Sequence, residues 1–205
     1  MRYLGAIALD SYQLLSRTPI AGVADLDGKK VGAVGLNQTW IRNTGAAPVS
    51  ITAVSAYNDL QTGVIDAIIL TPSLMRSSRI YEVAKNLTLV DFGAVFQLAL
   101  AVNLDRWEAL PDPVQQAIIK AADDWRLETV KRLSVAYRES IELMEENGVA
   151  IAPLTPEARV EWAERLPNVA KDWADGDPTR LKVLSAYVGA LTAGGTTLPR
   201  DWLSE

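Results

Sequence analysis

Apolar residues in the first third of the chain come in short runs that are separated by segments with a helical spacing. The apolar runs, which we expect to form strands, cover residues 3–9, 30–34, 48–51 and 66–70. Between them, residues 38–44 and 54–63 place apolar side chains three and four positions apart, as in a helix. Strands that alternate with helices indicate βαβ units and a largely parallel sheet.

The run at residues 67–70 is continuously apolar, which is typical of a strand that is covered on both faces. Gly63 lies where the preceding helix should end, because glycine readily adopts the left-handed conformation of a helix C-cap. Beyond this strand we expect a helix over residues 73–85 and strands over residues 87–90 and 94–104.

The longest periodic pattern runs from Asp112 to Asn147, with one polar turn at Thr129. Asp112 and the proline after it suit a helix start, and Asn147 followed by Gly148 suits a helix stop. At 1.5 Å per residue such a helix spans about 54 Å, which exceeds the diameter of a small domain. We therefore expect one continuous helix that crosses two lobes and contacts both the sheet and the C-terminal helices. A long helix of a bundle would show the same periodicity.

Two further helices are expected in the C-terminal part of the chain. One begins after Thr155 and ends near Gly176, and the other begins after Asp177 and ends near Gly194. Each opens with a capping side chain that is followed by proline, which is a typical helix start.

Composition and charge exclude several classes of function. The 205 residues carry 20 Lys and Arg against 25 Asp and Glu, a net charge of −5, so we expect no nucleic-acid partner. The chain has no cysteine and no histidine, which excludes Ser-His-Asp and Cys-His catalysis and zinc sites with these ligands. No apolar stretch approaches the roughly 18 residues that span a bilayer.

No motif in the sequence indicates catalysis or a cofactor. Residues 28–30 lack the glycine spacing of a phosphate-binding loop, and the acidic pairs at 123–124 and 145–146 point about 100° apart on a helix. We therefore expect a binding protein rather than an enzyme, with no catalytic residue, cofactor or metal site.

Several segments resemble the DctP-type solute-binding proteins of TRAP transporters. These are DLDGKKV at residues 25–31, YNDLQTGVID at 57–66, IYEVAKNLTLVDFG at 80–93 and NLDRWEALP at 103–111. The order of the segments also matches the family, and LQTGVID is the most specific of them.

The resemblance implies a periplasmic-binding-protein-like (Venus flytrap) α/β fold, in which a small solute binds between two lobes and passes to the membrane permease subunits of the transporter. It implies a second-lobe α/β domain with hinge and crossover strands at residues 1–103. Residues 104–205 would be the spanning helix and a C-terminal helical part of the first lobe. Family members carry an export signal and most of a first lobe before the matching point, so we expect an N-terminally truncated, periplasmic chain that can form a homo-oligomer.

The sequence departs from the family where its members bind a carboxylate. Gly32 stands where most members have an arginine, and Tyr12 lies in the segment matching another cleft arginine. Without these carboxylate-binding arginines, the resemblance implies either an organic acid that is bound by other groups or a more apolar solute. It also implies that Gly32 lies at a strand end facing the cleft and leaves open space there. The candidate ligand-binding residues are Tyr12, Gly32, Asn37, Trp40, Leu70, Thr71 and Gln97.

Two other functions are compatible with the sequence. In a helical interaction or assembly protein, the long helix would pair with a second copy and no small ligand would exist. An enzyme would have only the analogy of fold in its favour, because no residue pattern supports it.

Overall fold

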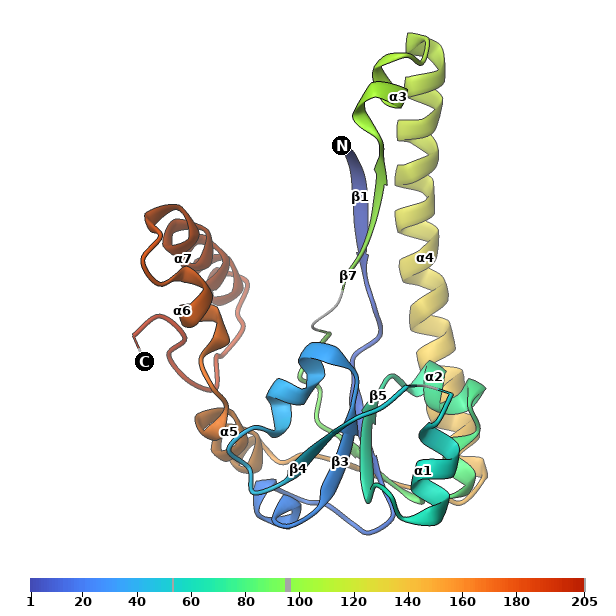
Figure 1. Cartoon of the computed structure of the whole chain (residues 1–205), viewed down its shortest axis with the longest axis vertical. Coiled ribbons are helices and arrows are strands. Elements are labelled where there is room, and N and C mark those ends of the chain that lie inside the picture. The colour runs from blue at the N-terminus through green and yellow to red at the C-terminus, as the bar shows by residue number, and fades with distance from the viewer. Residues whose placement is uncertain (53, 95–96, 205) are drawn as a thin grey trace.

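The structure, a computed structural model, describes residues 1–52, 54–94 and 97–204, apart from the side chains of Ala8 and Gln97. Figure 1 shows a body that contains a twisted sheet, and an extension that rises from it. The extension consists of a two-stranded ribbon and most of one long helix. A C-terminal pair of helices lies on the other side of the body from this long helix.

The body is built on a six-stranded sheet with the order β4-β3-β5-β2-β6-β8. β3 is parallel to β4 and β5, and β6 is parallel to β8. β2 is antiparallel to both of its neighbours, β5 and β6. The largely parallel sheet that the sequence predicts is therefore confirmed. The strands are β2 (Gln13–Ser16), β3 (Lys30–Ala33), β4 (Ala47–Ser50), β5 (Ala67–Leu70), β6 (Asn86–Leu89) and β8 (Ala150–Pro153).

Two of these strands, β2 and β8, were not predicted. Each has only four residues and pairs with strands far away in the chain, β2 with β5 and β6 and β8 with β6, so the local sequence does not show them. β8 also lies beyond residue 103, so the sheet takes a strand from the later part of the chain. The division of the chain at residue 103 remains a prediction.

The two faces of the sheet are covered by two separate apolar clusters. Leu15 and Ile68 point into a cluster with α1 (Ala56–Thr62), α2 (Pro72–Ser77) and the end of the long helix. Leu14 and Ile69 point into the other cluster, which includes Trp40 and Trp162. Adjacent residues of one strand thus enter opposite clusters, which confirms that residues 67–70 are covered on both faces.

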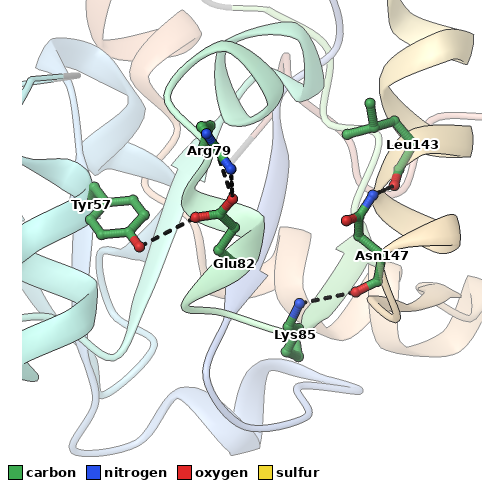
Figure 2. Close-up of polar contacts among 6 residues, drawn as sticks. All are labelled: Tyr57, Arg79, Glu82, Lys85, Leu143 and Asn147. Carbon is green, nitrogen blue, oxygen red and sulfur yellow. Dashed lines mark hydrogen bonds and ion pairs between the residues drawn. The ribbon is translucent and has the colours of Figure 1, made fainter.

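The long helix α4 (Asp112–Glu146) is continuous through Thr129, as predicted. It ends at Asn147, whose amide Nδ2 donates to the Leu143 carbonyl at 2.7 Å, and the next residue, Gly148, adopts a φ of 77°. Figure 2 shows the Lys85 ammonium donating to the Asn147 carbonyl at 3.0 Å. A cation at this position also compensates the negative end of the helix dipole.

The extension contains β1 (Arg2–Ala8) and β7 (Gln97–Val102), which pair antiparallel, and α3 (Leu104–Glu108) at its tip. α4 packs along β1 and, lower down, against α2. The expected contact of α4 with the C-terminal helices is wrong, because these lie across the body from it (Figure 1). They are α5 (Pro156–Arg165), α6 (Val169–Ala174) and α7 (Pro178–Ala193).

Two predicted helices are interrupted. The helix expected over 73–85 becomes α2 and a 3₁₀ turn at Ile80–Glu82, because Arg79 adopts a left-handed φ of 57°. The guanidinium of Arg79 donates to the Glu82 carboxylate, which also accepts a hydrogen bond from the Tyr57 hydroxyl at 3.3 Å (Figure 2). The helix expected from 155 to 176 is divided into α5 and α6 around a proline at 167.

Candidate functional site

The candidate site lies at the carboxyl edge of the sheet. β3, β5 and β6 run in one direction and end at this edge, while β2 begins there because it runs in the opposite direction. The edge therefore collects residues that precede β2 and residues that follow the other strands. In open α/β sheets this edge is where ligands generally bind.

A chain of aromatic rings crosses this edge. The rings of Tyr12 and Trp40 are 5.9 Å apart, those of Trp40 and Phe92 are 5.6 Å apart, and those of Phe92 and Trp162 are 5.2 Å apart. All three pairs are close to perpendicular, which is a favourable geometry for aromatic rings. The indole N–H of Trp162 donates to the Trp40 carbonyl at 2.7 Å and ties α5 to the 3₁₀ segment η2 (Gly35–Ile41).

Asn37 lies in the same 3₁₀ segment and is completely buried. Neither its amide oxygen nor its amide nitrogen has a hydrogen-bond partner of good geometry among the described residues. Burial raises the pKa of Tyr12, and the nearby Asn37 amide opposes part of this rise. A buried amide without a partner is costly for the folded state, so Asn37 is a residue that stability alone does not explain.

Leu70 and Thr71 reach the same edge, but their side chains are used by the fold. Leu70 is part of the apolar cluster beneath α1 and α2. The Thr71 hydroxyl accepts the backbone N–H of Leu74 at 3.4 Å and caps the start of α2.

The predicted open space beside Gly32 is wrong. A Cβ atom at Gly32 would come within 2.8 Å of the Ile65 side chain and 3.3 Å of the Ile51 side chain. Because side chains alternate along β3, position 32 faces the α1 side of the sheet, whereas Trp40 lies in the cluster on the other side. The last predicted residue, Gln97, begins β7, and its side chain is outside the described part of the structure.

Two cavities flank Trp40. One, of about 320 Å³, is lined by Trp40, Phe92 and Arg159 together with the C-terminal tail. The other, of about 420 Å³, lies between Trp40 and α6 and is almost wholly apolar. Both volumes are in the range of small-ligand sites.

Arg159 is the cation at this aromatic edge, and sequence reasoning missed it. Its two terminal nitrogens donate to the backbone carbonyls of Val90 and Asp91 at 2.6 and 2.7 Å. The guanidinium also stacks on the Phe92 ring, 5.5 Å from its centre. Arg159 therefore fixes the segment after β6, and its positive charge has no acidic partner among the described residues.

A polar cluster lies at the same edge on the face toward α4, and sequence reasoning missed it too. The completely buried Gln13 amide donates to the Asp91 carboxylate at 2.6 Å and to the Tyr137 hydroxyl at 2.9 Å, and it accepts the Asp91 backbone N–H at 3.1 Å. Next to it, the Asp10 carboxylate accepts a hydrogen bond from Ser73. Gln13, at the start of β2, thus joins the segment after β6 to α4, and Asp10 joins the segment before β2 to α2.

Two groups in this cluster have a raised pKa. Burial raises the pKa of Asp10, and the hydrogen bond from Ser73 offsets part of the rise. Burial also raises the pKa of Tyr137, and the nearby carboxylates of Asp91 and Asp10 add to this effect, while the Gln13 hydrogen bond opposes it. Both groups therefore favour their neutral forms more than they would in water.

Over the described ranges, no group of three acidic side chains is close enough together to hold a metal ion. A search of the same residues finds no helix that is both long and apolar enough to cross a membrane.

An open α/β sheet with chain crossings and a candidate site at its carboxyl edge is an architecture that suits ligand binding, and similarity to known proteins identifies the class. Residues 4–176 match the family of bacterial extracellular solute-binding proteins, family 7, which is the DctP family. The chain belongs to this family, as the resemblance implied, and this membership favours solute binding over the assembly alternative.

Curated relatives come from several bacteria. The ectoine-binding periplasmic protein TeaA of Halomonas elongata is 31% identical over 163 residues, which are 77% of this chain and 47% of TeaA. The 2,3-diketo-L-gulonate-binding periplasmic protein YiaO of Escherichia coli is 27% identical over 159 residues, covering 77% of this chain and 48% of YiaO. The chain thus spans about half the length of the curated relatives it matches.

Solved structures confirm the fold. The high-resolution structure of the ectoine-binding protein from Halomonas elongata superimposes with a TM-score of 0.81 at 26% identity, covering 93% of this chain and 64% of that one. A TRAP periplasmic solute-binding protein from Shewanella oneidensis with bound succinate gives a TM-score of 0.77 at 23% identity, covering 92% of this chain and 62% of that one. The periplasmic-binding-protein-like α/β fold is therefore correct.

Proposed function

We propose that this chain acts as the solute-binding subunit of a TRAP-type transporter, in the periplasm, and hands a small solute to the membrane permease subunits. The observation that carries the proposal is the aromatic edge, where Tyr12, Trp40 and Phe92 gather beside the completely buried amide of Asn37. Membership in family 7 supports the same function.

The position of this edge suits a protein that closes around its solute. Tyr12 directly precedes β2 and Phe92 follows β6, so both belong to the two chain segments that lead from the body into the extension. A solute in the cavity lined by Trp40 and Phe92 would contact the crossing after β6 directly, and the crossing before β2 through the Tyr12 ring, which packs on Trp40. Binding would then favour the arrangement of the crossings that brings the rings together.

The chemistry of the edge favours a solute that is not held by an arginine clamp. Position 32 has neither a guanidinium nor room for one, and the terminal nitrogens of Arg159 are occupied by backbone carbonyls. Aromatic faces and an amide remain as recognition groups. We therefore favour an organic acid held differently, or a more apolar molecule with hydrogen-bonding groups, over a small dicarboxylate.

The test is calorimetric titration of the chain with ectoine, succinate and D-glucuronate, each repeated as a thermal shift. A ligand that binds only the native state adds RT ln(1 + [L]/Kd) of stability, so a true solute raises the melting temperature with concentration. We expect ectoine or glucuronate to bind more tightly than succinate.

Variants locate the site. Trp40→Leu should weaken binding of the active solute at least tenfold, and Tyr12→Phe, which keeps the ring, should weaken it less. Tyr187→Leu is the matched control, because this ring is exposed on α7 and lines neither of the two cavities beside Trp40. Binding that survives Trp40→Leu in folded protein, or no response to any of the three solutes at millimolar concentration, would contradict the proposal.

A further inference from the structure

A third cavity, of about 520 Å³, lies on the face of the sheet edge opposite the aromatic rings. Its walls are the segment before β2, with Leu9 and Asp10, the segment after β6, with Asp91, and the middle of α4, with Leu133, Tyr137 and Arg138. We call it the crossing cavity, because it lies where both chain crossings meet α4. Tyr12, Trp40 and Phe92 do not line it, so it is separate from the proposed solute site.

Two carboxylates line the crossing cavity, and neither forms an ion pair with a cation among the described residues. Asp10 is only 8% exposed, and its one hydrogen-bond partner among the described residues is the Ser73 hydroxyl. Asp91 is oriented by Gln13, which binds one carboxylate oxygen through its side chain at 2.6 Å. Of the two, Asp10 is buried, and Asp91 is exposed. A buried carboxylate without a positive partner is unfavourable, and a cationic group placed in this cavity would compensate Asp10.

The basic side of the cavity is a single guanidinium. Arg138 makes no hydrogen bond or ion pair with any described residue, in contrast to Arg132 on the same helix, which pairs with Glu128 at 2.8 Å. A free guanidinium presents a planar set of donors that matches a carboxylate with two parallel hydrogen bonds. Leu9, Leu133 and the ring of Tyr137 supply apolar surface to the same cavity.

We propose that the crossing cavity is a second binding site, which takes a small zwitterion with an ammonium group toward Asp10 and Asp91 and a carboxylate toward Arg138. The volume suits a molecule of this size. A dicarboxylate is disfavoured because one of its charges would face Asp10 or Asp91. A simple amine leaves Arg138 without a partner, and a simple carboxylate leaves both acids without one.

The test compares three molecules of nearly equal size, 4-aminobutyrate, butylamine and butyrate, by calorimetric titration of the whole chain, with β-alanine as a shorter zwitterion. We expect a zwitterion to bind, and butylamine and butyrate to bind at least tenfold more weakly. Equal binding of the zwitterion and either singly charged analogue, or no binding of either zwitterion at millimolar concentration, would overturn the proposal.

Variants then assign the site. Arg138→Gln and Asp10→Asn should each weaken zwitterion binding at least tenfold, whereas Arg132→Gln, on the same helix, should leave it unchanged. Because Arg138 is exposed, Arg138→Gln gives a folded protein in which the result can be interpreted. Full binding in both Arg138→Gln and Asp10→Asn, or loss in Arg132→Gln, would place the ligand elsewhere.

Substitutions at the aromatic edge separate this proposal from the proposed function. Tyr12→Phe and Trp40→Leu should leave zwitterion binding in the crossing cavity unchanged. If they abolish it, the zwitterion binds at the aromatic edge, and the crossing cavity is not a site.

Discussion

The two halves of α4 have the same helical periodicity but lie in different surroundings. In the C-terminal half, Ser140 and Met144 are completely buried, and Met144 belongs to the cluster beneath α1 and α2. In the N-terminal half, Ala122 is the buried residue, while Val114 is 42% exposed and Leu127 is 55% exposed. One half is part of the body, and the other half is the spine of the extension.

This difference shows that periodicity makes the helix but does not decide what covers it. The C-terminal half is stabilised by side chains of the body that pack against it, together with the Lys85 contact at its end. The N-terminal half lies beside the two-stranded ribbon of β1 and β7. This ribbon itself exposes Leu98 and Leu100. We expect substitutions of similar size to have unequal effects in the two halves.

Met144→Ala should have the largest effect. It removes most of a completely buried side chain, and such truncations typically lower the free energy of unfolding by about 2–5 kcal/mol. Leu127→Ala, on the same helix, should change it by about 0.5 kcal/mol or less, because the side chain is largely exposed. Urea titration followed by circular dichroism measures both values. Equal losses of unfolding free energy in the two variants would mean that the N-terminal half of α4 is covered in solution.

The junction between body and extension offers a second contrast, between two buried amides. Gln13→Leu leaves the Asp91 carboxylate and the Tyr137 hydroxyl without their partner, so the free energy of unfolding should fall by about 1–3 kcal/mol. Asn37→Leu removes an amide that has no hydrogen bond of good geometry among the described residues, so the free energy of unfolding should stay equal or rise. The same urea titrations compare them. A loss in Asn37→Leu as large as in Gln13→Leu would show that Asn37 is hydrogen-bonded.

Asp10 makes the junction sensitive to pH. Its pKa is raised in the folded protein, so its ionised form destabilises the fold above that pKa, and the penalty disappears as the pH falls below the ordinary value of 3.8. Asp10→Asn should therefore stabilise the protein near pH 7, and the gain should shrink as the pH is lowered toward 3.8. Melting curves of the parent protein and of Asp10→Asn, recorded from about pH 3.5 to about pH 7.5, test this. A gain that grows with acidity would mean that the pKa is lowered instead.

The smallest effect on stability is expected on the outer face of the ribbon, where Leu98 is 52% exposed. Leu98→Lys should change the free energy of unfolding by about 0.5 kcal/mol or less. It should alter association instead, because exposed apolar faces and strand edges favour pairing between copies. We expect light scattering to give a mass above the 22.3 kDa chain for the parent protein and a lower mass for Leu98→Lys. A parent protein that is monomeric at all concentrations would contradict the predicted homo-oligomer.

Much of the fold could be read from local patterns. The limits of α4, the end of α1 at Gly63 and the doubly covered strand β5 all follow from the nature and spacing of neighbouring residues. The order of the segments around LQTGVID also led to the correct family. Each of these features depends on residues close together in sequence.

The tertiary structure alone decided how the sites are assembled. The Gln13 side chain bonds to residues 78 and 124 positions away in the chain, and no local pattern specifies such a pair. β2 is a strand because β5 and β6 lie on either side of it, and position 32 is closed because Ile51 and Ile65 pack against it. Local periodicity determined most of the helices and strands, whereas β2, β8 and the two sides of the carboxyl edge arise from contacts between segments that only folding brings together.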